Sequence, residues 1–291
     1  MKFKEKKKLK NEEKIKIMVK VSHELPNNML HMSKEINDYE YCLPHLLDKV
    51  QFYVKNENPP QVYRDHFLQA KKDGRYIIMD NSLHELGKAY DEERLIHWLY
   101  ELKPNEFIVP DVWENQIATV ANAKNWMDIG IPSITKKVAV VQAKSFEEAV
   151  ACYISLKYIG YTKIAFSYGA QYYNDLFPHP NKFVGKMMGR IMTIHKMWDM
   201  GIIEPTDKGH LLGCALPQEF AYYKKLMGLG IIQSLDTSNP IIHGLKGIKY
   251  EHYGLKEKDS TKIDQLEEVE LTSDVLYNIN HNLIKFKQFL K

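Results

Sequence analysis

Six short apolar runs, each ending at a polar residue, constrain the fold of this 291-residue chain more than any other feature. The runs end at Asp80, Asp111, Gln142, Ser167, Cys214 and Asp236. Successive end points are 22 to 47 residues apart, with amphipathic segments between them, as in βα units. In a barrel of parallel strands, the loops after the strands gather on one rim. The sequence therefore predicts an α/β fold of the (β/α)8 TIM-barrel type, with polar side chains from distant segments meeting at that rim.

The segments between the runs carry helix signals. Helices are expected over residues 92–102, 117–130, 145–160, 181–202 and 217–230, and from about Thr272 to the end. Residues 14–21 alternate lysine with apolar residues, which is typical of an entry strand or a lid. Residues 41–75 look irregular, apart from a short helix over 65–72. The proline-rich segment 175–182 predicts a loop over the barrel mouth.

Length and composition favour one domain over residues 1–291, with a basic N-terminal arm and a C-terminal helix. The three cysteines, Cys42, Cys152 and Cys214, are too widely separated for a CxxC site or a disulfide framework. They indicate a reducing compartment and no structural zinc. The sequence shows neither a signal peptide nor an apolar run of membrane-spanning length, so a cytoplasmic location is expected.

Lysine is concentrated near the two ends of the chain. Six of the first ten residues are lysine, and Lys285, Lys287 and Lys291 form a second cluster, although the net charge is only +3. Such clusters can contact nucleic-acid phosphates, and they are also common as solvated termini. Both readings stay open from the residues alone.

Asp80 and Asp236 suit displacement at the anomeric carbon of a sugar. One carboxylate attacks and forms a covalent glycosyl intermediate, while the other donates a proton to the leaving group and later accepts one. The competing interpretation for either aspartate alone is a helix N-cap or a loop hydrogen bond. The pair together favours catalysis.

Asp111 and Gln142 suit recognition of a guanine-like base. A carboxylate accepts from N1–H and the exocyclic amine, and a carboxamide donates to O6. Backbone N–H groups near Ser167 and Gly169 could add a donor. An ordinary hydrogen bond at the barrel rim is the alternative for Gln142.

Other barrel chemistries lack their residues in this sequence. No lysine ends a predicted strand, so Schiff-base chemistry has no nucleophile, and no HxH or HExxH pattern supports a hydrolytic metal centre. His84, His210 and His243 either line the mouth or are structural or surface residues. Tyr172 and Tyr173, with Phe177 nearby, either stack on bases or plug the rim.

Over roughly residues 75 to 245, the chain resembles the tRNA-guanine transglycosylase family. IIMDNS resembles the family's acid/base segment, with Asp80 as the matching residue. FIVPDVWEN, QAKSFEEAV and FSYGA resemble its base-binding segments. HLLGCALPQEF followed by IIQSLDTSNPIIHG resembles the stretch that leads to the nucleophile, with Asp236 in that role. Two departures stand out: Asn81-Ser-Leu-His-Glu85 replaces the usual serine, double glycine, phenylalanine and glutamine, and the cysteines of the family's zinc subdomain are missing.

Without that subdomain, the chain is most similar to the phage branch of 7-deazaguanine DNA transglycosylases. The resemblance implies exchange of guanine in DNA for a 7-deazaguanine such as preQ0, without metal or cofactor, in the host cytoplasm if the protein is phage-encoded. It also leaves a homodimer open as an assembly. The base-binding residues expected are Asp111, Gln142, Ser167, Gly169 and Gly213. The residues expected to contact nucleic acid are Tyr172, Tyr173, Phe177, Asn239 and His243. A tRNA-directed transglycosylase and a non-catalytic nucleic-acid-binding barrel remain the alternatives.

Overall fold

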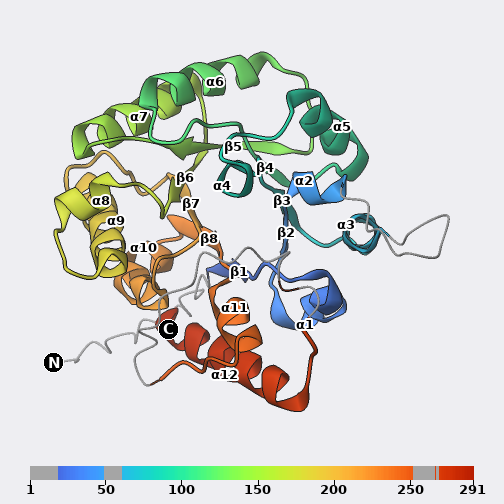
Figure 1. Ribbon diagram of the computed structural model, residues 1–291. Coiled ribbons are helices and arrows are strands. Elements are labelled where there is room, and N and C mark those ends of the chain that lie inside the picture. Colours follow the sequence, from blue (N-terminus) through green and yellow to red (C-terminus); the bar gives the residue numbers. More distant parts are fainter. Residues whose placement is uncertain (1–18, 49–60, 252–265, 267–268) are drawn as a thin grey trace, which may run out of the picture.

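The computed structural model describes residues 19–48, 61–251, 266 and 269–291. In this part of the chain, eight parallel strands form one sheet in the order β1-β8-β7-β6-β5-β4-β3-β2. The strands are β1 Lys20–Ser22, β2 Glu40–Cys42, β3 Ile77–Met79, β4 Glu106–Ile108, β5 Lys136–Val141, β6 Lys163–Ser167, β7 Lys208–Leu212 and β8 Ile232–Asp236. The sheet curls into a nearly closed barrel with helices around it (Figure 1), so the predicted (β/α)8 fold is confirmed.

The six apolar runs of the sequence are strands β3 to β8. Because successive side chains of a strand point to opposite faces, each run contributes residues to both the inner and the outer face of the barrel wall. In β6, the Phe166 ring stacks on Tyr153 of helix α7 (Phe146–Ile159), with ring centroids 5.8 Å apart. Lys163, Ala165 and Ser167 lie on the opposite face of the strand from Phe166. Ala165 is fully buried, and Lys163 reaches Glu106 and Ser234 across the barrel interior. In β6 the outward Phe166 is therefore apolar, whereas the inward face carries the polar Lys163 and Ser167 on either side of the small Ala165.

Strands β1 and β2 stand at opposite ends of the hydrogen-bonded strand order, and side chains bridge the seam between them. Asn37 accepts from the N–H of His23 at 2.7 Å and donates to the carbonyl of His23 at 2.9 Å. Asp38 makes a similar pair of contacts with the backbone of Val21. The Tyr39 hydroxyl adds a hydrogen bond to the carbonyl of Leu235 in β8. Side-chain contacts and one backbone hydrogen bond, from the N–H of Asp38 to the carbonyl of Val21, thus replace a strand ladder where the barrel closes.

Helices fill the connections between strands. The α-helices besides α7 are α1 Ser33–Ile36, α2 Pro44–Leu47, α3 Val62–Lys72, α4 Leu83–Leu86, α5 Glu92–Leu102, α6 Gln116–Asp128, α8 Tyr172–Leu176, α9 Lys182–Asp199, α10 Lys224–Gly228, α11 Asn239–Leu245 and α12 Ser273–Phe289, and the 3₁₀ segments are η1 Asn27–Met32 and η2 Pro217–Tyr223. The expected helices over 65–72, 92–102, 117–130, 145–160 and 181–202 correspond to α3, α5, α6, α7 and α9. The last expected helix is α12, whose N-cap is Thr272 and which packs on α11. None of the helices in the described ranges is both long and apolar enough to cross a membrane.

Three local expectations need correction. The single helix expected over 217–230 is a 3₁₀ segment followed by the short α10. η2 turns Glu219 inward, where the buried Arg190 and the Tyr223 hydroxyl both donate to its carboxylate. The irregular region 41–75 contains part of strand β2 and helix α2, which are too short to leave a periodic pattern. Asp175 and Leu176 belong to α8, so the loop expected over 175–182 is shorter.

The alternating segment 14–21 ends in β1, which pairs with β8 as an entry strand would. The basic arm at the start of the chain lies outside the described residues.

Candidate functional site at the carboxyl ends of the strands

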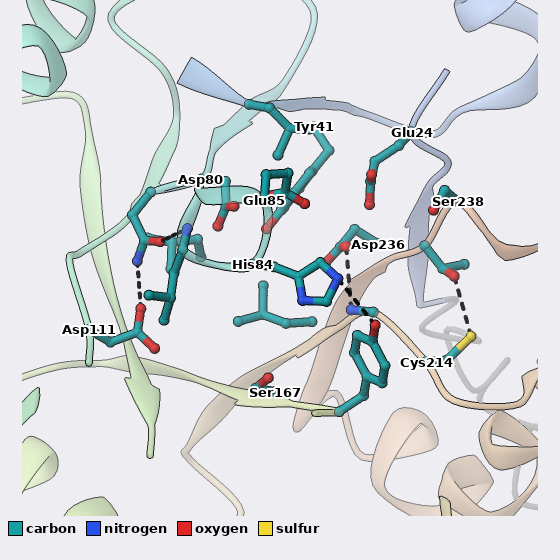
Figure 2. Close-up of a pocket in the computed structure, with 18 of the residues that line it drawn as sticks. Glu24, Tyr41, Asp80, His84, Glu85, Asp111, Ser167, Cys214, Asp236 and Ser238 are labelled. Atoms are coloured by element: carbon teal, nitrogen blue, oxygen red, sulfur yellow. Dashed lines mark hydrogen bonds between the residues drawn. The ribbon is translucent and has the colours of Figure 1, made fainter. Parts of the chain in front are cut away.

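A pocket opens at the carboxyl ends of the barrel strands, and every strand or the loop after it contributes to its lining. One residue from each, in the order β1 to β8, is Glu24, Tyr41, Asp80, Asp111, Gln142, Ser167, Gly213 and Asp236. Figure 2 shows Asp80 and Asp111 on one side of this pocket and Asp236 on the other. The predicted convergence of distant polar residues therefore occurs, since parallel strands all end at the same rim.

Asp236 is the last residue of β8, where it pairs with Ser22 of β1. The residue is 4% exposed, and its carboxylate is held by two groups, one from β7 and one from the residue after it. Oδ1 lies 2.9 Å from Nε2 of His210, and Oδ2 accepts from the N–H of Gly213 at 3.3 Å. Hydrogen bonds of this kind favour the ionised form of a carboxylate. Asp236 is thus a fixed, buried carboxylate whose orientation is set by two neighbours.

Asp80 follows β3 directly, and its environment differs from that of Asp236. The N–H of Ser82 donates to Asp80 Oδ2 at 3.1 Å, from a backbone turn in which Ser82 has a left-handed φ of 60°. Burial, and then the negative charge of Asp236, raise the pKa of Asp80 from 3.8 to about 7. Asp80 is therefore poised to exchange a proton near neutral pH, as a general acid or base requires.

Asp111 and Gln142 lie side by side and are hydrogen-bonded to each other. Gln142 Nε2 donates to Asp111 Oδ2 at 2.6 Å, and Asn81 Nδ2 donates to Asp111 Oδ1 at 2.6 Å. The Gln142 carbonyl accepts from the N–H of Glu114 at 3.0 Å. Burial raises the pKa of Asp111 to about 6, against the opposing effect of Gln142 and Asn81. Both side chains are fixed in place, and each keeps capacity for another partner, since a carboxylate offers about four acceptor sites and an amide nitrogen two donors.

The three smaller residues expected at the base site have different positions. Ser167 ends β6 and lines the pocket. Gly213 also lines it, but its N–H points to Asp236, and a Cβ there would lie 2.5 Å from the Tyr168 ring. Gly169 packs against Trp113, which a Cβ would meet at 2.4 Å. Gly169 thus makes room for the indole ring, and Gly213 holds the carboxylate.

Tyr172 and Tyr173 are buried at 4% and 2% exposure, so they cannot stack on an incoming strand, which corrects that expectation. Their rings contact each other, and the Tyr173 hydroxyl donates to the carbonyl of Ser167 at 3.1 Å. Their burial fits the alternative interpretation, an aromatic plug at the rim, which stays a prediction. Phe177 is half-buried, with its ring stacked on His179.

Asn239 and His243 are buried in α11 and are not exposed to an incoming polymer. The prediction that they contact nucleic acid is therefore wrong for both residues. His243 Nδ1 lies 2.8 Å from the carbonyl of Asn239, and the Tyr250 hydroxyl donates to the Asn239 side chain. The helix that follows Asp236 turns inward onto α12, which the short sequence pattern alone did not reveal.

The sequence analysis did not single out three aromatic residues that line the pocket: Tyr41, Trp113 and Tyr168. His84 also lines it, as one of the two interpretations of that residue predicted. His84 on α4, Trp113 and Tyr168 form an aromatic group at the mouth, with ring centroids 6.1 and 5.7 Å from His84. Tyr41 stacks on His210 deeper in the barrel, with centroids 6.0 Å apart. A period of two could have found the buried group, because His210 and Ser234 precede the strand ends Leu212 and Asp236 by two residues.

The pocket is acidic. Glu24 and Glu85 line it together with Asp80, Asp111 and Asp236. A neutral heterocycle with several N–H groups suits such a lining, whereas a phosphate would be repelled. Among the described residues, no group of three or more histidine, cysteine, aspartate and glutamate side chains is arranged to hold a metal ion.

Fold and pocket together define a parallel β/α-barrel protein with an acidic pocket at the carboxyl ends of its strands. No family model and no curated protein matches the sequence. Among solved structures, the chain is similar to the Amycolatopsis orientalis BexX/CysO complex, at 9% identity and a TM-score of 0.42, over 94% of this chain and 92% of that one. Similarity at this level carries no argument about function.

Proposed function

We propose that this protein is a pentosyltransferase that exchanges guanine in DNA for a 7-deazaguanine base, as its resemblance to the transglycosylases implies. The observation that carries the proposal is the contrast between two buried aspartates in one pocket. Asp236 accepts hydrogen bonds from His210 and Gly213. Burial and the Asp236 charge instead raise the pKa of Asp80 to about 7. One carboxylate suits nucleophilic attack, and the other suits proton transfer.

The reaction needs only these two groups. An Asp236 oxygen attacks C1′ of the target deoxyguanosine while Asp80 gives its proton to the departing guanine. The 7-deazaguanine then enters, loses a proton to Asp80, and its nitrogen displaces Asp236 from C1′. One C–N bond is broken and one is formed, and configuration is retained after two displacements.

Asp111 and Gln142 supply the recognition of the base. The free lone pairs of the Asp111 carboxylate suit N1–H and the exocyclic amine, and the second Gln142 N–H suits O6. Asn81 and Glu114 hold the two side chains in register before a base arrives. A base with reversed donors and acceptors would leave buried groups unpaired, which strongly disfavours it.

The DNA must present the target base outside the stack, at a cost of a few kcal/mol. Because five carboxylates line the pocket, the phosphates would remain at the rim while the base enters. His84, Trp113 and Tyr168 offer ring faces at the entrance.

The test is incorporation of radiolabelled guanine and preQ0 into DNA and into unmodified tRNA by the purified protein. We expect label in DNA and a covalent protein–DNA adduct, with both lost in Asp236→Asn. Asp175→Asn, an exposed aspartate of α8, is the matched control and should label DNA as the wild type does.

Each of the other possible results would support a different conclusion. Label in tRNA alone would support the tRNA-directed alternative. Binding of DNA without label in either polymer would support the non-catalytic barrel. Wild-type exchange by Asp236→Asn would overturn the assignment of the nucleophile.

A further inference from the structure

A continuous chain of polar side chains runs through the barrel interior to Asp236. It starts at Glu106 in β4, whose carboxylate lies 2.6 Å from Nζ of Lys163 in β6. Lys163 Nζ is 2.9 Å from Oγ of Ser234 in β8, and that oxygen is 2.8 Å from Nδ1 of His210 in β7. His210 Nε2 then lies 2.9 Å from Asp236 Oδ1. Four strands thus contribute to one connected line.

The chemistry of these groups fixes the direction of every hydrogen bond. A protonated Lys163 can only donate, so Ser234 Oγ accepts from it. The single hydroxyl hydrogen of Ser234 is then free to donate to Nδ1 of His210. A neutral imidazole that accepts at Nδ1 carries its hydrogen on Nε2, and that hydrogen points at Asp236. The reverse tautomer would set a lone pair against the Asp236 carboxylate.

The surroundings of His210 keep it neutral. Burial, with the nearby positive charge of Lys163, lowers its pKa to about 3, although Glu106 opposes this and Arg190 adds to it. The ring is fully buried and stacks on Tyr41. The pKa of Lys163 is lowered by burial, which the Glu106 carboxylate offsets only in part. The two groups form an ion pair, with Nζ and Oε2 2.6 Å apart.

We infer that His210 is a positioning residue, held as the Nε2–H tautomer by Ser234 and the Lys163–Glu106 pair, and that it orients the Asp236 carboxylate for attack. This inference rests on the proposed function, because it takes Asp236 as the nucleophile. It goes further by assigning a role in that reaction to four buried residues that touch neither base nor sugar. The ion pair at the far end of the line makes the hydroxyl of Ser234 a donor toward the pocket.

The first measurement is the nitrogen NMR spectrum of the ¹⁵N-histidine-labelled wild-type protein between pH 5 and 8. We expect His210 to show a protonated Nε2 and an unprotonated Nδ1 throughout, with its signals identified by their loss in His210→Gln. Ser234→Ala should shift them toward a mixture of tautomers. A protonated Nδ1 in the wild type, in the neutral or the charged ring, would overturn the inference. This readout does not depend on catalysis.

The second measurement is the rate of covalent adduct formation with DNA. His210→Phe keeps a ring against Tyr41 but removes the donor, and we expect a roughly 10- to 100-fold slower rate. The acid limb of the pH profile should move to higher pH, and DNA affinity should not change. His210→Gln, whose amide can replace Nε2–H, should recover most of the rate.

His195→Phe is the matched control, because His195 also stacks on a tyrosine, Tyr223, and has Nε2 on a carbonyl, but lies outside the pocket. Unfolding curves check that each variant folds. Equal rates for folded His210→Phe and wild type, or no recovery in folded His210→Gln, would overturn the inference. If wild-type protein forms no adduct and exchanges no base, the proposed function fails. The NMR spectrum of the His210 tautomer then decides by itself whether His210 donates to Asp236.

Discussion

Asp80 and Asp236 are the same side chain in two different environments, and this contrast matters most at the scale of single residues. Asp236 lies at the end of a line of donors, whereas Asp80 has a backbone N–H and the charge of Asp236 nearby. Burial, and then the charge of Asp236, raise the pKa of Asp80 and so favour a proton on Asp80. Division of roles between two aspartates follows from their neighbours.

The raised pKa of Asp80 predicts a pH-dependent cost to stability. Between pH 4 and 7, the folded protein holds a proton on Asp80 that the unfolded chain has released, so this group's contribution to the free energy of unfolding falls as pH rises through that window. Asparagine cannot ionise. We therefore expect Asp80→Asn to gain stability relative to wild type as pH is raised from 4 to 8, by about 1 to 4 kcal/mol.

Urea unfolding at several pH values measures this difference. Asp175→Asn, at an exposed position, serves as the control and should show no such trend. A stability difference between Asp80→Asn and wild type that stays constant from pH 4 to 8 would contradict the raised pKa.

At the scale of elements, the close approach of α8 and α9 supports one side of the rim. A Cβ on Gly189 of α9 would lie 2.2 Å from the backbone carbonyl oxygen of Tyr173 in α8. Tyr173 in turn is tied to the last residue of β6, Ser167, which lines the pocket. The glycine therefore sets the distance between two helices and, through Tyr173, the position of a strand end.

Gly189→Ala should accordingly destabilise the protein, by about 1 to 3 kcal/mol, because neighbouring backbone cannot move aside cheaply. Alanine normally stabilises a helix relative to glycine by up to about 1 kcal/mol. Gly228→Ala, at the end of α10 with nothing within 4 Å of its Cβ, should be neutral or stabilising. Thermal unfolding of both variants compares them, and an equal effect of the two changes would show that the helices separate freely.

At the scale of the whole molecule, the barrel is held shut at the β1–β2 seam by Asn37 and Asp38 instead of a strand ladder. Asn37→Ala removes both hydrogen bonds to the backbone of His23. We expect a loss of about 2 to 4 kcal/mol, since two buried backbone groups are left without partners. Amide hydrogen exchange should also become faster in β1 than in β6.

The exposed Asn280 of α12 offers the matched change, Asn280→Ala, which should leave both measurements near wild type. Unchanged exchange in β1 of Asn37→Ala would mean that closure depends on packing alone. A homodimer and the DNA partner are separate whole-molecule expectations, and they stay predictions.

Much of the fold was predictable, for reasons visible in particular segments. The runs ending at Asp80, Asp111 and Asp236 are apolar because both faces of a barrel wall are covered, and their end points are polar because they reach the rim. Strand β2 escaped prediction, because its three residues stand in a region without a longer apolar run. Strand β1 did not, because the alternating segment 14–21, an entry strand in one of its two interpretations, ends in it. The 3₁₀ form of η2 also escaped prediction, and the pairing of its Glu219 with Arg190 of α9 is a contact between separate elements that no local pattern shows.

The sequence by itself determined the order of βα units and the polar residues at the strand ends, because parallel connectivity brings all those ends to one rim whatever the details of packing. Only the tertiary structure decided which of them are available to a ligand. The sequence predicted nucleic-acid contacts for four residues that are in fact buried: Tyr172, Tyr173, Asn239 and His243. His210 became the neighbour of Asp236 through strand pairing. Burial and long-range pairing arise from contacts between segments far apart in the chain, so short local patterns do not encode them.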